Sequence, residues 1–275
     1  MTEFCCSDLS VQTRSATLLR QISFSAKAGE LIGVIGPNGA GKSTLMRAMA
    51  GLRSHQGETR WNGRNVSAMT SAERALQIAY MPQERMVHWP MDCLDLVLLG
   101  RQPHRARFAA TSAEDRDLAR SAMHRMDVES FAERAFDTLS GGEQARVLIA
   151  RMLAQDTACL IADEPVNGLD PGHQIGLMQT FQGLARSGHL VFVALHDLTL
   201  AGCWCDRLLL LEKGELRADE QPDILFASGL IEDIYGIRTS PITLESRTTI
   251  VPAALRGAAA GAGNETTGHA GETSK

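Results

Sequence analysis

Residues 36 to 44, GPNGAGKST, form the segment whose spacing points most directly to chemistry. They fit the pattern G-x-x-x-x-G-K-[ST] and stand between an apolar run, Glu30–Ile35, and a helix-like run, Leu45–Ala50. A strand, a glycine-rich turn and a helix N-terminus together direct backbone N–H groups at one point, where a phosphate can bind. The alternative is a chance glycine turn. We expect a nucleoside triphosphate to be held by Gly36, Pro37, Asn38, Gly39, Ala40, Gly41, Lys42, Ser43 and Thr44. In such a cradle the lysine reaches the β- and γ-phosphates, and the serine hydroxyl binds Mg²⁺.

Two carboxylates follow another apolar run. Ala158–Ala162 predicts a buried strand, and Asp163 and Glu164 stand directly after it. At the end of such a strand Asp163 can hold Mg²⁺ through water, and Glu164 can polarise the water that attacks the γ-phosphate. The alternative is an ordinary acidic strand end. Beside a phosphate-binding segment, the pair favours metal binding by Asp163 and activation of water by Glu164.

A third segment, Leu139 to Glu143 (LSGGE), opens a helix that we predict to run to about Gln155. Ser140 and Glu143 have the spacing of a capping box, so one interpretation is a well-capped helix. The two glycines count against it, because each costs about 1 kcal/mol relative to alanine inside a helix. They are explained if a phosphate must approach the backbone of Ser140, Gly141 and Gly142 closely.

These three segments, in this order, resemble the ATP-binding subunits of ABC transporters, and the resemblance covers about Leu9 to Leu244. It implies an α/β fold with a P-loop NTPase core, a mainly parallel sheet, a small antiparallel β subdomain and an inserted helical subdomain. The apolar runs Leu190–Leu195 and Leu208–Glu212 agree with buried strands, and Lys213-Gly214 predicts a hairpin turn. The helical subdomain is expected at about residues 90–151, where the periodicity is helical.

The resemblance also implies roles for three further segments. Gln83, in the segment YMPQ, resembles the Q-loop glutamine, which touches Mg²⁺ and reports the state of the nucleotide to the membrane subunits. The segment Asn167 to Asp170 resembles the D-loop, which crosses the dimer interface, so Asp170 joins the nucleotide-binding residues. His196 resembles the switch histidine that contacts the γ-phosphate. A lone histidine would more often be a core residue, but its place after a predicted strand favours the site.

In the family, two subunits face each other head to tail. The resemblance therefore implies a homodimer in which Ser140, Gly141 and Gly142 of one subunit close on the ATP bound by the other. The expected cofactors are ATP and Mg²⁺. We expect Glu164, His196 and Gln83 to act in catalysis, and Ser43, Gln83 and Asp163 to bind the metal. The γ-phosphate would then bias an open–closed equilibrium.

Short patterns narrow the kind of transporter. Gly100-Arg-x-Pro-His104, Asp115-Arg-Asp117 and His173-Gln174 resemble importers of iron–siderophore, haem and cobalamin. This implies two transmembrane permease subunits, indirectly a substrate-binding protein, and a place on the cytoplasmic face of the inner membrane. One alternative is a soluble ABC ATPase acting on DNA or ribosomes, whose members usually carry two cassettes or a coiled-coil insertion. Another is a non-catalytic regulator, against which Glu164 and His196 argue.

The chain departs from the family pattern at several positions. Aligning Leu9–Val11 with the family's first strand puts Thr13 or Arg14 where an aromatic residue usually stacks on adenine. The arginine could stack through its guanidinium plane. Gln144-Ala-Arg146 replaces the common Arg-Gln-Arg after the signature, and Val166 stands where threonine is usual.

Composition sets the remaining expectations. The 275 residues are 44% hydrophobic and carry a net charge of −5, which argues against a nucleic-acid partner held by bulk electrostatics. No N-terminal signal or membrane-length apolar run is visible, so we expect a cytoplasmic protein. The six cysteines show no zinc-like pairs, and we expect them to be reduced and structural. We assign residues 1–252 to the ATPase domain and 253–275, rich in Gly, Ala and Thr, to a disordered tail.

Overall fold

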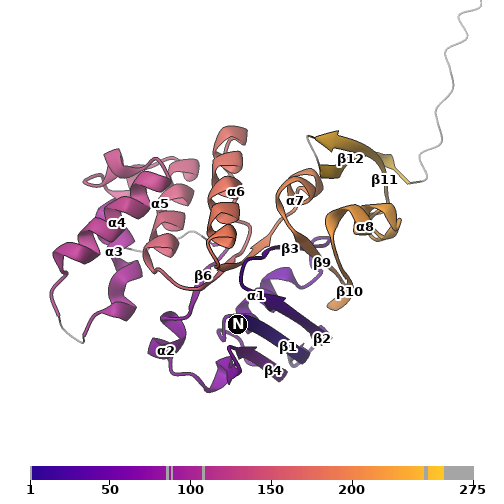
Figure 1. Cartoon of the computed structure of the whole chain (residues 1–275), viewed down its shortest axis with the longest axis horizontal. Coiled ribbons are helices and arrows are strands. Elements are labelled where there is room, and N and C mark those ends of the chain that lie inside the picture. Colours follow the sequence, from indigo (N-terminus) through magenta and orange to yellow (C-terminus); the bar gives the residue numbers. More distant parts are fainter. Residues whose placement is uncertain (1, 85–86, 88, 107–108, 245–246, 257–275) are drawn as a thin grey trace, which may run out of the picture.

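A six-stranded sheet forms the centre of the computed structural model, which describes residues 2–84, 87, 89–106, 109–244 and 247–256 (Figure 1). The strand order is β10-β9-β3-β8-β7-β6, and only β10 runs antiparallel to its neighbour. The strands are β3 (Leu31–Ile35), β6 (Ile78–Met81), β7 (Cys159–Ala162), β8 (Leu190–Ala194), β9 (Arg207–Glu212) and β10 (Glu215–Glu220). The predicted strands at 30–35, 158–162, 190–195 and 208–212 are all confirmed to within a residue or two.

Successive residues of the buried strands serve two separate cores. Leu31 and Ile35 of β3 pack among the helices on one face, whereas Ile32 and Val34 pack on the other face. Strand β8 divides in the same way. A strand buried on both faces has no need of polar alternation, which explains why these segments are continuous apolar runs in the sequence.

A four-stranded antiparallel sheet covers the second face. Its order is β2-β1-β4-β5, from β1 (Glu3–Gln12), β2 (Thr17–Lys27), β4 (Gln56–Trp61) and β5 (Arg64–Asn65). Phe192 of β8 meets Phe4 edge-on at 5.7 Å between ring centroids, and Phe24 at 6.0 Å. Helix α1 (Lys42–Met49) lies in this layer, with Leu45 and Met46 fully buried. The short helix α2 (Ser71–Ala75) follows the small sheet.

The expected helical subdomain forms the end of the molecule farthest from the C-terminal hairpin (Figure 1). It contains α3 (Cys93–Leu98), a 3-10 helix η2 (Leu99–His104), α4 (Ala113–Arg125) and α5 (Gly141–Ala154). Two of the segments that suggested an importer form contacts between the helices of this subdomain. Arg101 is buried, and it donates hydrogen bonds to the Asp115 carboxylate at 3.2 Å and to the Ala154 carbonyl at 2.9 Å. His104 ends η2 and contacts the Gln155 carbonyl at 2.8 Å.

Gly100 permits η2 to approach α5 closely. A Cβ at this position would lie 2.3 Å from the Arg151 carbonyl oxygen, a backbone atom that cannot move alone. We expect Gly100→Ala to lower the free energy of unfolding by about 1–3 kcal/mol, measured by urea denaturation. The matched control is Gly176→Ala in α6, where no atom lies within 4 Å of the added Cβ. Equal stability of the two variants would contradict the close packing of η2 on α5.

The C-terminal part was only partly anticipated. It consists of α6 (Pro171–Arg186), α7 (Leu198–Trp204), α8 (Pro222–Ala227), α9 (Leu230–Tyr235) and an antiparallel hairpin, β11 (Ile237–Leu244) and β12 (Arg247–Leu255). The hairpin packs on α7 through Ile250, which is buried, and Thr249, which donates to the Thr199 carbonyl at 3.1 Å. A tail starting at 253 was therefore placed too early, because β12 continues to Leu255. The rest of that predicted tail, 257–275, lies outside the described residues.

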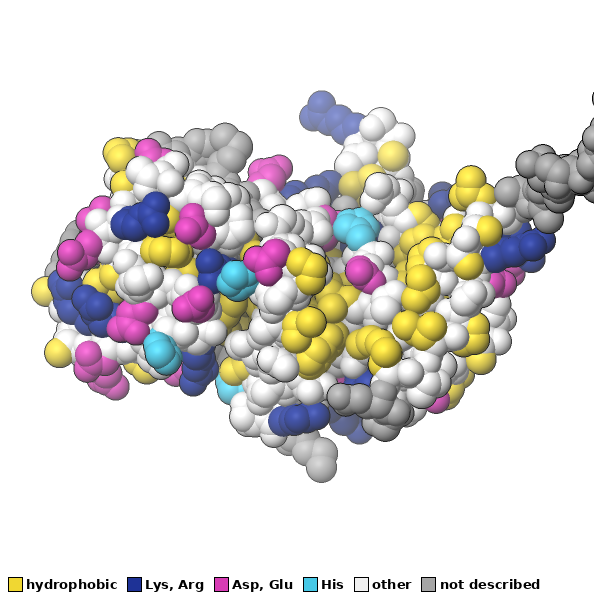
Figure 2. All heavy atoms as spheres, turned by 90° about the horizontal axis from the view of Figure 1, so that it is seen from above, with side chains coloured by type: hydrophobic (Ala, Val, Ile, Leu, Met, Phe, Trp, Pro, Cys, Tyr) yellow, Lys and Arg dark blue, Asp and Glu magenta, His cyan; other side chains and the backbone are white. Residues whose placement is uncertain are grey.

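Exposed apolar side chains, the cysteines and the character of the helices complete the description of the fold. Figure 2 shows hydrophobic side chains gathered towards the end of the molecule that carries α8 and β12, where Ile224 and Leu255 are exposed. All six cysteines are free, and burial raises the pKa of Cys6 to about 12. No helix in the part of the chain that the structure describes combines the length and apolar character needed to cross a bilayer.

Candidate active site

The predicted site residues converge because four neighbouring strands end at one edge of the sheet. The glycine-rich loop follows β3, His196 follows β8, Asp163 and Glu164 follow β7, and Gln83 follows β6. These strands are adjacent in the order β3-β8-β7-β6. Ligands of open parallel sheets bind outside the carboxyl ends of the strands. One cavity at this edge is lined by Thr17, Leu18, Arg20, Asn38, Gly39, Ala40, Gly41, Lys42, Ser43, Thr44, Gln83, Glu164, His196 and Lys213.

The loop between β3 and α1 has the conformation that its glycines permit. Gly36, Gly39 and Gly41 have φ angles of 149°, 78° and 106°, which other residues rarely adopt. A Cβ on Gly36 would also lie 2.3 Å from the Leu211 carbonyl oxygen. The Lys42 ammonium folds back into this loop and donates to the carbonyls of Gly36 at 2.7 Å and of Pro37 at 3.3 Å. The loop thus holds its only lysine inward, at the point where phosphate oxygens would replace the carbonyls.

Burial shifts the pKa values of Lys42 and Asp163 in the direction that favours the neutral form of each side chain. Burial lowers the pKa of the Lys42 ammonium, and the negative charges of Glu164 and Asp163 partly oppose that shift. Burial raises the pKa of the Asp163 carboxyl, while a hydrogen bond from Ser43 opposes it. Desolvation destabilises the charged forms of both Lys42 and Asp163. A triphosphate and a cation would each bring the opposite charge to these groups.

Asp163 and Ser43 present the oxygen ligands that Mg²⁺ prefers. The Ser43 hydroxyl donates to Asp163 Oδ1 at 3.1 Å, and the Tyr80 hydroxyl donates to Oδ2 at 3.4 Å. Arg47 in turn donates to the Tyr80 oxygen at 3.3 Å. The fully buried carboxylate is fixed beside the loop with oxygen ligands at hand, so the residues present fit a magnesium ion.

Glu164 occupies the centre of a polar cluster. Its carboxylate accepts hydrogen bonds from Gln83 Nε2 at 2.6 Å and from Asn167 Nδ2 at 2.7 Å, and it contacts His196 Nε2. Its backbone φ of 54° is unusual for a non-glycine residue and costs on the order of 1–3 kcal/mol. Gln83, predicted near the metal, here lies against Glu164 by its amide nitrogen. A carboxylate held by two amides and an imidazole can accept a proton from water at a fixed position.

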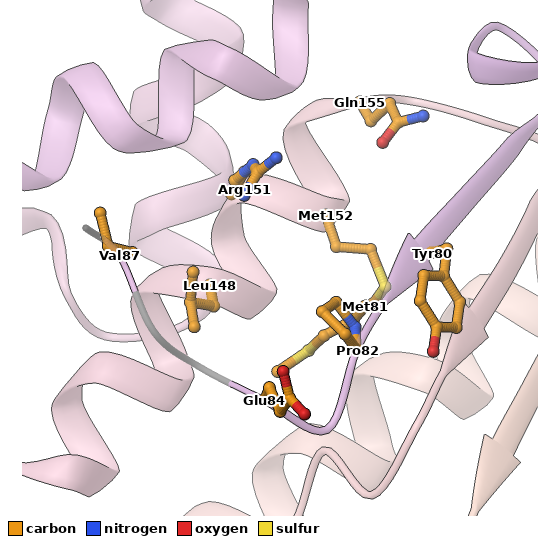
Figure 3. Close-up of a pocket in the computed structure, with 9 residues that line it drawn as sticks. All are labelled: Tyr80, Met81, Pro82, Glu84, Val87, Leu148, Arg151, Met152 and Gln155. Carbon is orange, nitrogen blue, oxygen red and sulfur yellow. The ribbon is translucent and has the colours of Figure 1, made fainter. Parts of the chain in front are cut away.

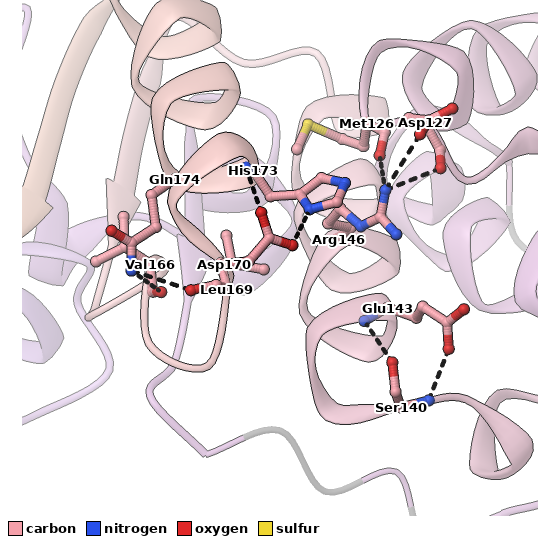
Figure 4. A network of polar contacts seen from close by, with 10 residues as sticks. All are labelled: Met126, Asp127, Ser140, Glu143, Arg146, Val166, Leu169, Asp170, His173 and Gln174. Atoms are coloured by element: carbon pink, nitrogen blue, oxygen red, sulfur yellow. Dashed lines mark hydrogen bonds and ion pairs between the residues drawn. The ribbon is translucent and has the colours of Figure 1, made fainter.

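The other predicted nucleotide contacts lie away from this cavity. Ser140, Gly141, Gly142 and Asp170 are not among the described residues that line it. The capping box at α5 is confirmed: Ser140 accepts from the Glu143 N–H at 3.4 Å, and Glu143 accepts from the Ser140 N–H at 2.8 Å (Figure 4). No atom lies within 4 Å of a Cβ built on Gly141, so its backbone is open to an approaching ligand. The arrangement therefore accommodates both interpretations of the LSGGE segment.

Residues of the signature helix α5 and of the start of α6 have hydrogen-bond partners within the chain. Gln144 donates to the carbonyls of Phe136 at 3.3 Å and Leu139 at 3.2 Å, which fixes the segment before the signature. Arg146 is buried and donates to the Asp127 carbonyl at 3.1 Å (Figure 4). Asp170 caps α6 by accepting from the His173 N–H at 3.1 Å. These contacts tie the signature helix to α4, and they order the start of α6.

Sequence reasoning missed one wall of the cavity. Thr17, Leu18 and Arg20 come from β2, and Lys213 comes from the predicted β9–β10 turn. Their place follows from tertiary contacts with the glycine-rich loop, so no local pattern could have signalled it. Thr13 and Arg14, considered for adenine stacking, do not line the cavity in the described structure.

A glycine-rich loop with its inward lysine, the buried carboxylate of Asp163 and the Glu164 carboxylate beside His196 have the arrangement expected of a P-loop nucleotide hydrolase on an α/β sheet. The family model described as ABC transporter matches residues 19–167. The chain belongs to the ABC transporter family and is an ATP-binding subunit that hydrolyses ATP.

Relatives and solved structures agree with this assignment. The chain is 40% identical over 219 residues to the hemin import ATP-binding protein HmuV of Nocardia farcinica, covering 79% of this chain and 75% of that protein. It is 40% identical to the HmuV protein of Streptomyces coelicolor, covering 82% and 81%. An inward-facing metal-chelate type ABC transporter shares the fold, with a TM-score of 0.79 at 24% identity, covering 92% of this chain and 98% of that one. A bacterial ABC transporter cassette solved as a dimer has a TM-score of 0.71 at 26% identity, covering 80% and 98%.

Proposed function

We propose that this chain energises the import of a metal chelate of the haem, iron–siderophore or cobalamin type. The observation that carries the proposal is the 40% identity, over about four fifths of the chain, to two proteins named for hemin import. The four strand ends that bring Lys42, Glu164 and His196 together supply the hydrolytic chemistry. The family resemblance adds a position on the cytoplasmic face of the inner membrane.

Within this proposal the site residues divide nucleotide binding, metal binding and hydrolysis among them. Lys42 and the loop N–H groups bind the β- and γ-phosphates, and Ser43 and Asp163 hold Mg²⁺ with help from Gln83. Bound Mg²⁺ would neutralise charge on the phosphate oxygens. Glu164 orients and deprotonates the attacking water, because its carboxylate is already held by Gln83 and Asn167. His196, in contact with Glu164, reaches the γ-phosphate from the adjacent strand.

The working form is a head-to-tail homodimer. Support comes from the separation of two half-sites within one chain: the cavity does not include Ser140, Gly141, Gly142 or Asp170 among its described lining residues. An open backbone at Gly141 is available to a phosphate bound elsewhere. A second copy turned by a two-fold axis would bring each signature segment to the other copy's cavity.

A groove between the Q-loop segment and the helical subdomain is the docking surface that we assign to the permease. It is lined by Tyr80, Met81, Pro82, Glu84, Val87, Leu148, Arg151, Met152 and Gln155 (Figure 3). Six of these nine residues are apolar or aromatic, and Glu84 and Arg151 add opposite charges from the two sides of the groove. Gln83 immediately precedes Glu84, so a helix seated in this groove would contact the segment that reaches Glu164.

The direct test is recovery of the partner from membranes. Tagged Glu164→Gln protein, loaded with ATP, is extracted from native membranes in mild detergent, and bound proteins are identified by mass spectrometry. We expect a polytopic permease, encoded with a binding protein for a metal chelate. A soluble complex on DNA or ribosomes, without a membrane protein, would overturn the importer proposal in favour of that alternative.

Arg151 should be needed for this association. Glutamate at position 151 would place a second carboxylate across the groove from Glu84. Removing the partner of a charge that is buried in an interface typically weakens binding by about 2–5 kcal/mol. We expect Arg151→Glu to reduce the recovered permease at least tenfold while leaving ATP binding within about twofold. The matched control is Arg186→Glu in the last turn of α6, outside the groove. Equal recovery with both variants would exclude the groove as the docking surface.

A further inference from the structure

The nucleotide cavity is lined by two sets of residues from different parts of the fold. The glycine-rich loop, Glu164 and His196 form the first set, which carries the groups proposed to bind the triphosphate. Thr17, Leu18 and Arg20 of β2 and Lys213 of the β9–β10 turn form the second set. Because the first set engages the phosphates, the second set is the wall available to the ribose and the base.

Backbone contacts hold this second wall against the loop. The Arg20 N–H donates to the Gly214 carbonyl at 2.8 Å, and the Gly214 N–H donates to the Ala40 carbonyl at 3.0 Å. A Cβ on Gly41 would lie 2.7 Å from Leu19 Cδ2 and 3.2 Å from the Leu18 carbonyl. Strand β2 and the β9–β10 turn are therefore fixed directly beside the glycine-rich loop, and Arg20 lies in the segment that contacts it.

Arg20 is the planar group on this wall. None of the described residues that line the cavity is aromatic apart from the histidine of the first set. Thr13 is instead engaged in a tight turn, with its N–H donating to the Ala16 carbonyl at 2.8 Å and its hydroxyl oxygen accepting from the Ala16 N–H at 3.0 Å. The Arg20 side chain lines the cavity, is 60% exposed and pairs with Glu215 at 3.5 Å, so much of the guanidinium-bearing side chain is accessible to a ligand in the cavity.

We propose that Arg20 binds the base of the nucleotide by stacking its guanidinium plane on the purine ring, with Leu18 as the apolar support beside it. The inference rests on the nucleotide site proposed above. A stacked guanidinium recognises the π-face of the ring, which adenine and guanine share, rather than the hydrogen-bonding edge by which they differ. The site therefore accepts purine nucleoside triphosphates as a class, and GTP binds within a few-fold of ATP.

The test compares nucleotides that keep or lack the base. Dissociation constants for ATP, GTP and inorganic tripolyphosphate, each with Mg²⁺, are measured by calorimetry on the wild type, Arg20→Ala and Arg20→Lys. We expect Arg20→Ala to weaken ATP and GTP about tenfold or more and tripolyphosphate less than twofold. Arg20→Lys keeps the charge but loses the plane, so it should resemble the alanine variant. The control Glu215→Gln removes the same ion pair and should leave all three constants within twofold.

Each contrary result has its own meaning. Unchanged ATP affinity in Arg20→Ala, or full rescue by lysine, would overturn the stacking assignment. An equal loss for tripolyphosphate would show that Arg20 acts through charge on the phosphates. A wild type that binds ATP at least tenfold more tightly than GTP would overturn the purine-class specificity. In all of these cases wild-type ATP binding itself survives, so the inference fails separately from the proposed nucleotide site.

Discussion

Glutamine in place of Glu164 is expected to lower kcat for ATP hydrolysis at least about a hundredfold while ATP still binds, because general-base catalysis contributes roughly 10²–10⁴ in rate. The carboxylate accepts from Gln83 and Asn167 and contacts His196, so it is positioned to take the proton of an attacking water. An amide of the same shape keeps most of these contacts but cannot take the proton. Single-turnover hydrolysis of bound ATP measures the chemical step directly.

The same variant tests the dimer. If two ATP molecules close a head-to-tail pair, blocked hydrolysis should make the dimer persist, and light scattering behind size-exclusion chromatography should show twice the monomer mass only with ATP. Glu58→Gln, an exposed residue of β4, is the control and should hydrolyse ATP as the wild type does. A Glu164→Gln protein that stays monomeric with ATP would overturn the head-to-tail dimer, and near-normal turnover would overturn the role of the carboxylate.

Alanine at Lys42 is expected to raise the Kd for ATP by about a hundredfold or more, beyond the millimolar range, since the variant loses charge-assisted bonds to two phosphates. The ammonium now bonds to the carbonyls of Gly36 and Pro37 in a buried position. Burial lowers the pKa of this lysine, and the negative charge of a bound phosphate would favour its protonated form.

Calorimetric titration with ATP measures the effect of Lys42→Ala, and Lys27→Ala, on the exposed end of β2, is the matched control. Thermal unfolding of both variants checks that the loop change leaves the fold intact. Binding at millimolar or better Kd in the Lys42 variant would show that the phosphate cradle has been assigned to the wrong residues.

Much of the core could be predicted from the sequence because its signals are local. The runs 31–35, 159–162 and 190–194 are apolar, and polar residues or glycine stand at or near their ends, such as Glu30, Asp163 and Gly188, so strand type and position follow directly. The β9–β10 hairpin was predicted from Lys213-Gly214, and both residues adopt positive φ angles. The β11–β12 hairpin escaped prediction, because its strands pair mainly with each other and bury little beyond Thr249 and Ile250.

The candidate site divides in the same way. Lys42, Asp163, Glu164 and His196 stand next to recognisable strand ends, so their meeting could be deduced from a parallel sheet with these strands as neighbours. Arg20 lies at the cavity because backbone hydrogen bonds join the segments near residues 20, 40 and 214. Such a contact depends on the packing of three distant segments, and no pattern around residue 20 reports it.

The strand order also sets a timetable for synthesis. Strand β3, which carries the phosphate loop, ends at residue 35, yet its neighbours β8 and β9 begin only at residues 190 and 207. At about 5–20 residues per second, roughly 8–30 s pass before the first neighbour has been translated. During that interval a five-residue strand that is apolar on both sides has no sheet partner on either side. Strand β3 and the phosphate loop are thus translated early, but the strands that pair with β3 are translated late. An unpaired apolar strand is prone to misassociation, so the nascent chain is exposed to this risk at the strand on which nucleotide binding depends.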